Sequence, residues 1–330
     1  MVNRALLLTK KLNTMKKIVT VLLSVILFYT TTSANNDYRD YYKSLVESKI
    51  DEANGKYEEA YKKYLVTLNS AYPFPDDIIA TIRCCMKTQH KKDIPQLIKL
   101  LVQSGFKTEE ETFPVLRKNN TMVDFYRTFP IKEYAEYFYS IYPQERKEYL
   151  TSDRELKSRI LNSFSTLEYF IIQQRMMMPN DIAVQENSYK IVCDLLLNLE
   201  NTDQDFSRLG TDTWLDQRFI VLLVHTAQYL FGIDYERFMR FDRFLWNMVL
   251  QGNLHAEQYG VIIDAAHFSK DGMSLFGNFL SSDEDGNWMV SPVKNLESVD
   301  SLRASIFLSP LWVKAKLKNI KLPAGYDYKK

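Results

Sequence analysis

The side chains best suited to chemistry lie in the C-terminal third of this 330-residue chain, where His225, His255 and His267 occur together with Asp264. Asp264 and His267 are three residues apart, which puts them on one face of a helix. Imidazole and carboxylate groups supply metal ligands and acid/base catalysts. We therefore take these four residues as catalytic candidates, although a lone histidine in an apolar helix is more often a satisfied core residue.

Established catalytic signatures are missing from the sequence, which contains no HExxH, no GxSxG and no glycine-rich phosphate loop. An acidic loop at 281–287 has the alternating spacing of a calcium loop. With Gly286 as the sixth residue of that loop, however, Pro292 falls where the bidentate glutamate belongs. The Asp285-Gly286 pair is also the ordinary signal of a hairpin turn. We expect neither a bound metal nor a cofactor.

Three cysteines, Cys84, Cys85 and Cys193, show no repeated spacing. An odd count argues against a disulfide framework, and the spacing does not fit a zinc site. Cys85 lies on the apolar side of a helical pattern, where a free cysteine behaves as a small hydrophobic residue. A bridge between the adjacent cysteines would strain a helix. We expect all three to be core thiols.

Long helices are the elements expected to position these residues, because the chain has only 10 glycines and 10 prolines. Residues 38–104 have the pattern of two helical hairpins. The later helices in this range are expected at 76–88 and 94–104, and Gly105 is the expected stop for the last one. The best-marked helix runs from Gly55 to Leu68. Its apolar positions follow helical spacing: Tyr57, Ala60, Tyr61, Tyr64, Leu65 and Leu68.

This Gly55–Leu68 segment resembles the second helix of a tetratricopeptide repeat, which has the same order of glycine, aromatic, alanine and aromatic residues. The match covers about half of one repeat. It implies a stacked array of helical hairpins, which we place at residues 35–150. The aromatic residues of 107–149 either line a groove for sugars or peptides or fill the seams between hairpins, and their helical spacing favours the seams.

Residues 151–330 are predicted to form a second helical domain. Its expected helices are Phe219–Phe231, Tyr235–Leu250 with Gly252 as its stop, and a third capped by Asn253 with Glu257 in its first turn. A change of period predicts a β-hairpin with strands 276–280 and 288–290. Two short helices, 296–307 and 312–320, close the chain. The fold class is therefore all-α, a helical-hairpin (tetratricopeptide-like) array followed by a helical domain with one small β-hairpin.

The part from Tyr189 to Ile320 resembles a bacterial domain family of unknown function. That family has a histidine ending an apolar helix, a Tyr-x4-Asp-Arg pattern on a later helix, and a Tyr-Gly-Thr-Gln hairpin. The corresponding residues here are His225, Tyr259, Asp264 and Phe276-Gly277. Ala265 replaces the arginine, and Asn278-Phe279 replaces Thr-Gln, so this chain keeps only some of the polar residues of the family pattern. The resemblance implies a fold and no known activity.

The N-terminal residues predict a secretory signal peptide. Lys16 and Lys17 precede the apolar run 18–29, which at 12 residues is shorter than the roughly 20 that span a bilayer. Small residues before Asn35 predict cleavage after Ala34. The true start is Met1 or Met15. An uncleaved anchor or a buried core helix is the less favoured alternative, and we expect a periplasmic or secreted product with no stable membrane anchor.

Cleavage would also change the charge of the protein. Residues 1–34 contain five basic residues and no acidic one, so 37 basic and 41 acidic residues would remain, a net charge near −4. Such a chain is a poor candidate for binding nucleic acid. We favour a protein- or peptide-interaction module of the cell envelope. The alternatives are a hydrolase-like or metal-assisted enzyme in the C-terminal domain, or a structural component of an envelope assembly.

Overall fold

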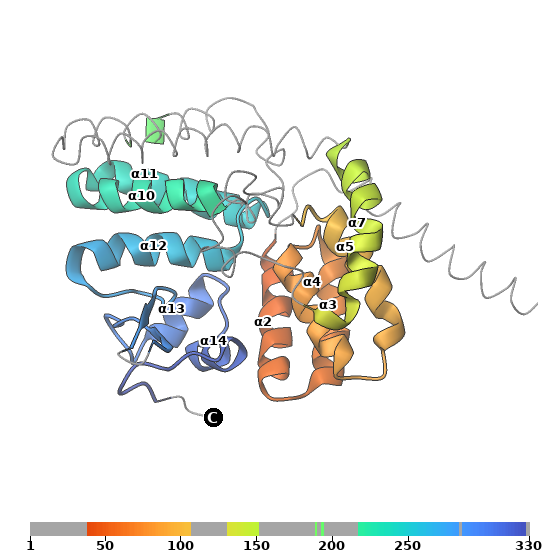
Figure 1. The fold of residues 1–330 in the computed structure, drawn as a ribbon. Coiled ribbons are helices and arrows are strands. Elements are labelled where there is room, and N and C mark those ends of the chain that lie inside the picture. Colours follow the sequence, from red (N-terminus) through yellow and green to blue (C-terminus); the bar gives the residue numbers. More distant parts are fainter. Residues whose placement is uncertain are drawn as a thin grey trace, which may run out of the picture. The chain divides into compact units, whose positions relative to one another are not determined.

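The computed structural model describes residues 38–106, 131–151, 189, 193–194 and 217–327, apart from 284 and 285. All of these belong to one structural unit that begins at Asp37. In these parts the chain is helical except for one short two-stranded sheet, which confirms the all-α fold class (Figure 1). The predicted leader, and with it the cleavage site after Ala34, lies outside the described residues.

Helical hairpins make up the N-terminal region. Its helices are α2 (Arg39–Ala53), α3 (Tyr57–Ser70), α4 (Pro75–Met86), α5 (Ile94–Gln103) and α7 (Ala135–Leu150), with the short 3-10 turns η1 (Lys91–Asp93) and η4 (Lys132–Tyr134) before α5 and α7. Each of these five helices packs against the next one along the chain (Figure 1). This arrangement fits the expected array. We call α2–α7 the array below.

The predicted face of α3 is the buried one. Ala60 and Tyr64 are fully buried, and Tyr61 and Leu68 nearly so, whereas Tyr57 at the first turn is 36% exposed. The small side chain of Ala60 leaves room for the neighbouring helices to approach closely. Local periodicity was therefore sufficient to place this helix and its packing face.

Three longer helices form the first part of the C-terminal region: α10 (Gln217–Ile233), α11 (Tyr235–Leu250) and α12 (Ala256–Asp271). They lie side by side and pack against one another (Figure 1). The antiparallel strands β1 (Leu280–Ser282) and β2 (Trp288–Val290) follow, with Ser281 opposite Met289, and then α13 (Val299–Ser305) and α14 (Leu311–Lys318). Within the described ranges, no helix combines the length and the apolar character that a membrane span requires.

Two predicted boundaries in this region were wrong. The cap of α12 is His255, whose side chain accepts the Glu257 N–H, and not Asn253. The N–H of Asn253 instead bonds the Met248 carbonyl, which closes the preceding helix. The first strand begins at Leu280 and not at Phe276, because the backbone N–H groups before it bind a side chain of α12.

The cysteines Cys84, Cys85 and Cys193 are free and fully buried, as predicted. Burial raises the pKa of the Cys85 thiol to about 11 and that of Cys193 to about 12. A thiol with a raised pKa forms little nucleophilic thiolate near neutral pH. These residues act as packing groups.

Helices from both expected domains contribute to one hydrophobic core, which includes Leu45 and Ile78 of the array together with Leu245 and Ile262. Backbone contacts join the same regions. The Tyr38 N–H bonds the Leu250 carbonyl at 2.9 Å, and the α2 helix packs against α14. The surface between the array and the C-terminal helices is therefore a packed interface, and the N-terminus of α12 lies in it.

Candidate functional site

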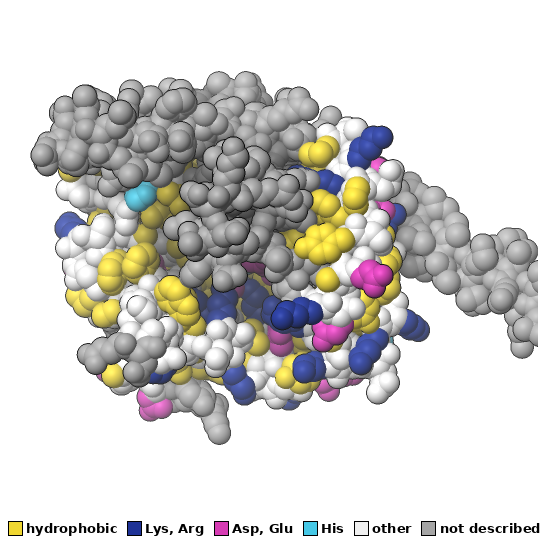
Figure 2. Space-filling view, viewed as in Figure 1, with side chains coloured by type: hydrophobic (Ala, Val, Ile, Leu, Met, Phe, Trp, Pro, Cys, Tyr) yellow, Lys and Arg dark blue, Asp and Glu magenta, His cyan; other side chains and the backbone are white. Residues whose placement is uncertain are grey.

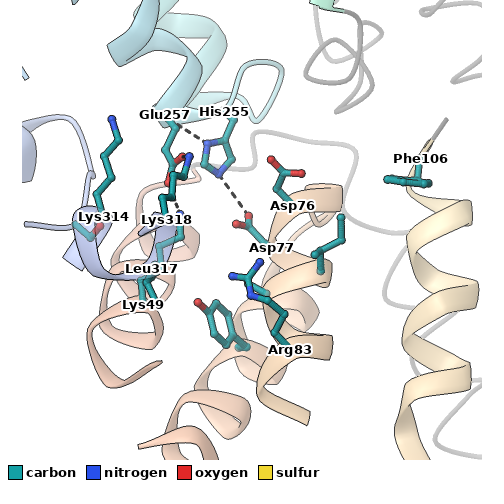
Figure 3. A pocket seen from close by; sticks show the side chains of 14 residues that line it. Lys49, Asp76, Asp77, Arg83, Phe106, His255, Glu257, Lys314, Leu317 and Lys318 are labelled. Atoms are coloured by element: carbon teal, nitrogen blue, oxygen red, sulfur yellow. Dashed lines mark hydrogen bonds and ion pairs between the residues drawn. The ribbon is translucent and has the colours of Figure 1, made fainter. Parts of the chain in front are cut away.

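A cavity of about 280 Å³ lies where the N-terminus of α12 meets the array (Figure 3). Its walls come from α2, α3, α4, α12 and α14, together with Phe106 after α5 and Ser309 before α14. Charged and apolar side chains alternate around it: Lys49, Tyr64, Asp76, Asp77, Ile79, Ala80, Arg83, Phe106, His255, Glu257, Ser309, Lys314, Leu317 and Lys318. Small-ligand sites usually combine apolar walls with a few oriented polar groups, and this cavity has that composition.

His255 is built into the structure through both ring nitrogens. Its Nδ1 accepts the Glu257 N–H at 3.0 Å and thereby caps α12. Its Nε2 lies 3.5 Å from Oδ2 of Asp77, and the side chain is 2% exposed. Because Nδ1 acts as an acceptor, Nε2 carries the ring N–H, and this nitrogen faces the carboxylate.

Asp77 is the buried carboxylate of this pair. The Tyr41 hydroxyl donates a 2.6 Å hydrogen bond to its Oδ2. Burial, and after it the charge of Asp77, raises the pKa of Tyr41 well above its usual value. A carboxylate that accepts from a hydroxyl and faces an imidazole N–H has the partners that a buried charge needs. Asp77 thus joins α2 and α4 to the cap of α12.

Glu257 forms the second charged centre. It binds Lys49 Nζ at 2.7 Å and Lys318 Nζ at 3.2 Å. Burial alone would raise the pKa of Glu257, but Lys318 and Lys49 hold it well below its ordinary value. Conversely, Glu257 raises the pKa of Lys49 although burial acts to lower it. Lys49, Asp77, His255, Glu257 and Lys318, which we call the junction cluster, therefore hold α2, α4, α12 and α14 together.

Two cations lie at the more exposed part of the cavity. The side chains of Arg83 and Lys318 are 50% and 53% exposed. Arg83 reaches Glu52 only through long contacts of 3.3 Å. Lys314 also lines the cavity, but its ammonium group is directed away from it, toward the Gly277 carbonyl and the Asn278 side chain (Figure 3). The lining of the cavity therefore includes two half-exposed cations, together with the partly exposed carboxylate of Asp76.

Both carboxylate oxygens of Asp264, the catalytic candidate on α12, accept hydrogen bonds from backbone N–H groups. Oδ1 accepts the N–H groups of Leu275 and Phe276 at 2.7 and 2.8 Å, and Oδ2 accepts that of Asn278 at 2.6 Å. The residue is fully buried. Burial raises the pKa of Asp264, and the three N–H groups act in the opposite direction. We call this arrangement the Asp264 clamp, because it fixes the chain between α12 and β1.

The two remaining histidines have other neighbours. His225 Nδ1 is 3.2 Å from the side-chain oxygen of Gln228 on the same helix. His267 packs against the ring of Phe231 at 4.4 Å between centroids, and burial lowers the pKa of His267. Of the four catalytic candidates, only His255 lines the cavity. The structure gives each of the four its own set of contacts, and their catalytic role stays a prediction.

Sequence reasoning did not select the other charged residues of the junction cluster as site residues. Lys49 and Asp77 come from the array, and Lys49 is 208 residues from Glu257 in the chain. Glu257 was noticed only for its place in the first turn of a helix. No spacing pattern in the sequence links these residues, and Lys49 lies in a helix with several other charged residues, so no local signal marks it.

Within the described part of the chain, no group of three or more histidine, cysteine, aspartate or glutamate side chains is arranged so that it could hold a metal ion. In the acidic loop, Asp283 accepts the Asn287 N–H at 2.7 Å and pairs with Lys321. These contacts are those of a closed hairpin turn.

Comparison with known proteins adds nothing to this geometry, because no protein-family model, no curated protein and no solved structure matches the chain. The two resemblances seen in the sequence therefore stay expectations. What the protein does has to be argued from the junction cluster and its cavity.

Proposed function

We propose that this chain is an exported interaction module of the cell envelope, and that its partner is a protein or peptide that inserts a side chain into the cavity beside the junction cluster. The observation that carries the proposal is this cavity, whose lining includes apolar side chains and two half-exposed cations, while the nitrogens of its one imidazole are engaged in structural contacts. Such a site can bind without being able to catalyse.

Stacked helical hairpins support the same proposal. Arrays of this kind hold extended partners along their surface without catalytic residues. Here the first helices of the array, α2, α3 and α4, also border a cavity, which gives a partner a place for an anchoring side chain. Buried anchors of this type dominate many protein interfaces. The resemblance to tetratricopeptide repeats and to the bacterial family of unknown function belongs to this proposal, as does the periplasmic or secreted location.

Site-specific photo-crosslinking tests the proposal in the native cell. A photoreactive amino acid replaces Leu317 in the cavity wall, and in a matched control it replaces Val66, which is 66% exposed on α3. We expect a covalent polypeptide adduct from position 317 and none from position 66. Recovery of the position-317 protein as a monomer, without adduct and without metal, would contradict an interaction role.

The leader is tested on the same preparation. N-terminal sequencing of the exported protein should begin at Asn35. A start at Met1 or Met15 in protein recovered from the envelope would show that the leader is retained, and a nearby start would correct the cleavage position.

An enzyme is the second candidate, because His255 and Asp77 form a buried imidazole–carboxylate pair at a cavity. This candidate predicts hydrolysis of simple nitrophenyl esters or phosphates by the purified protein, and loss of that activity in His255→Gln. Equal rates for the two proteins would remove the His255 site as an enzyme centre, while leaving the interaction proposal in place.

A further inference from the structure

The acidic groups in the cavity wall are Asp76, Asp77 and Glu257, and each of them already interacts with other residues. Asp77 accepts from Tyr41 and faces His255, and Glu257 is held between Lys49 and Lys318. A cationic group of a ligand would therefore have to displace existing contacts of buried carboxylates. Removing such a contact from a buried charge is costly. The carboxylates of the wall are not the groups that select a ligand.

The basic groups at the rim have unused donors. A guanidinium carries five N–H donors, and Arg83 uses two of them on one oxygen of Glu52, each at 3.3 Å. An ammonium carries three, and one contact is recorded for Lys318 in the described part of the chain, at 3.2 Å to Glu257. Both side chains are about half exposed. The donor capacity that a ligand could fill thus belongs to cations.

Glu257 would stay neutralised if a ligand drew Lys318 away. Lys49 binds it at the shorter distance of 2.7 Å, and the Lys49 side chain is only 13% exposed. Lys49 is therefore the permanent partner of Glu257, and Lys318 is the partner that can be shared. On the face shown in Figure 2, Lys and Arg side chains gather where α2 and α14 pack against each other.

The apolar part of the cavity wall is formed by Ile79, Ala80, Phe106 and Leu317, and Tyr64, Asp76 and Ser309 add polar groups to the lining. Its volume of about 280 Å³ lies just below the range for small-ligand sites, roughly 300–1,000 Å³. One or two side chains fill such a space, whereas a folded segment does not fit. The cavity thus suits a short apolar group next to an anionic one.

We infer that the cavity recognises an acidic side chain of a partner polypeptide, next to an apolar residue, with the carboxylate bound between Arg83 and Lys318 and the apolar side chain against Ile79 and Leu317. The inference rests on the proposed interaction function and specifies the chemistry of its partner. Charge-assisted hydrogen bonds to two cations select a carboxylate over an amide of the same shape.

Binding of two peptide pools tests the inference with the protein lacking only residues 1–34. Both pools are acetylated and amidated, so that neither terminus is charged, and contain a central Leu-Glu or Leu-Gln pair between randomised neutral positions. Fluorescence anisotropy should show at least tenfold tighter binding of the Leu-Glu pool, with the difference shrinking as salt is raised. Equal binding would overturn the inference and leave the interaction function standing.

Substitutions at the rim locate the effect. Arg83→Gln and Lys318→Gln alter half-exposed side chains, and each should weaken Leu-Glu binding about tenfold while leaving Leu-Gln binding unchanged. Lys62→Gln, a 67% exposed lysine on α3, is the matched control and should leave both affinities unchanged. An equal loss with Lys62→Gln would mean general electrostatic attraction and would overturn the assignment to the cavity.

Two further results would reject the inference. Tight binding of N-acetyl-glutamate alone, at the affinity of the Leu-Glu pool, would identify a small-molecule site in place of a polypeptide site. Absence of binding by either pool would reject the recognition chemistry, and the crosslink at position 317 would then decide separately whether a polypeptide partner occupies the cavity at all.

Discussion

The N-terminus and the middle of α12 use buried acidic chemistry in opposite ways. Near the middle of the helix, Asp264 accepts three backbone N–H groups, and neither carboxylate oxygen is left to act on a ligand. At its N-terminus, Glu257 and the capping His255 bind side chains from other helices beside a cavity. One helix therefore carries one set of contacts that fixes the chain following it and another set that attaches the C-terminal helices to the array.

The difference lies in what satisfies the charge. Backbone N–H groups are fixed once the chain has folded, so the Asp264 clamp has one arrangement. The junction cluster uses long lysine side chains, one of which is 53% exposed and able to move toward a ligand. Buried carboxylates are therefore not equivalent indicators of function. Only where the partner of the carboxylate can move does a ligand have the chance to replace one of its contacts.

Asp264→Asn should have the largest effect on stability. The amide would place an NH2 group against backbone N–H donors, leaving buried groups unsatisfied. We expect a loss of about 3–5 kcal/mol in the free energy of unfolding, measured by urea denaturation. Asp271→Asn, at the C-terminal end of the same helix, is the control. It weakens an ion pair with the half-exposed Lys294 but keeps an oxygen for the Met273 N–H, and it should change the free energy of unfolding by less than about 1 kcal/mol. Similar values for the two variants would refute the clamp.

Gly260→Ala tests the packing of the same region. A Cβ at Gly260 would lie 2.1 Å from Nδ2 of Asn278, and Asn278 cannot swing aside because its Oδ1 accepts from Arg303 and Lys314. We expect a loss of about 1–3 kcal/mol. Gly232→Ala in α10 meets nothing within 4 Å and should stabilise the protein by about 0.5 kcal/mol, since alanine favours a helix. In thermal unfolding, Gly260→Ala should lower the melting temperature and Gly232→Ala should raise it.

Local sequence information was enough for most of the fold. The apolar spacing of α3, α5 and α11 and the positive-φ glycines Gly105 and Gly252 mark helices and their stops within a few residues. The first strand was placed too early because the residues before it are apolar and resemble a strand. What excludes Phe276 from the sheet is a hydrogen bond to Asp264, twelve residues away, which no strand pattern reveals.

The candidate site was less predictable for the same physical reason. Its charged contacts join residues separated by up to 208 positions, and each is an ordinary solvent-facing residue by local pattern. Of the four catalytic candidates, His255 lines the cavity, but its recorded role there is to cap α12 through the Glu257 N–H. Chemistry-bearing residue types could be recognised from the sequence, whereas their partners required the packing of α12 against the array.

Glu257→Gln should destabilise the junction less than Asp264→Asn destabilises the clamp, by about 1–2 kcal/mol near neutral pH. The pKa of Glu257 is lower in the folded chain than in the unfolded one, so its contribution is present above the unfolded value of about 4.3. It is lost as the pH falls through the folded value.

The difference between wild type and Glu257→Gln should accordingly shrink in acid. Urea unfolding at pH 7 and at decreasing pH measures it, with Lys62→Gln as a control that removes an exposed charge elsewhere. A difference that stayed constant through acid pH would show that the side chain acts by shape and not by charge, which would remove the electrostatic role of the junction cluster.

Lys321→Ala should have the smallest effect on stability, because it removes an exposed ion pair and not a buried one. Lys321 is the main cause that lowers the pKa of Asp283 to about 2, and the Asn287 N–H contributes as well. Without the lysine, the Asp283 pKa should rise toward about 3.9, the ordinary value, and stop short of it because the Asn287 bond at 2.7 Å remains. Carboxyl NMR titration measures this, and thermal unfolding should not change. A marked loss of stability would show that the hairpin turn supports the C-terminal fold as the Asp264 clamp does. The exposed ion pair would then contribute more to stability than exposed pairs usually do, since solvent normally screens them.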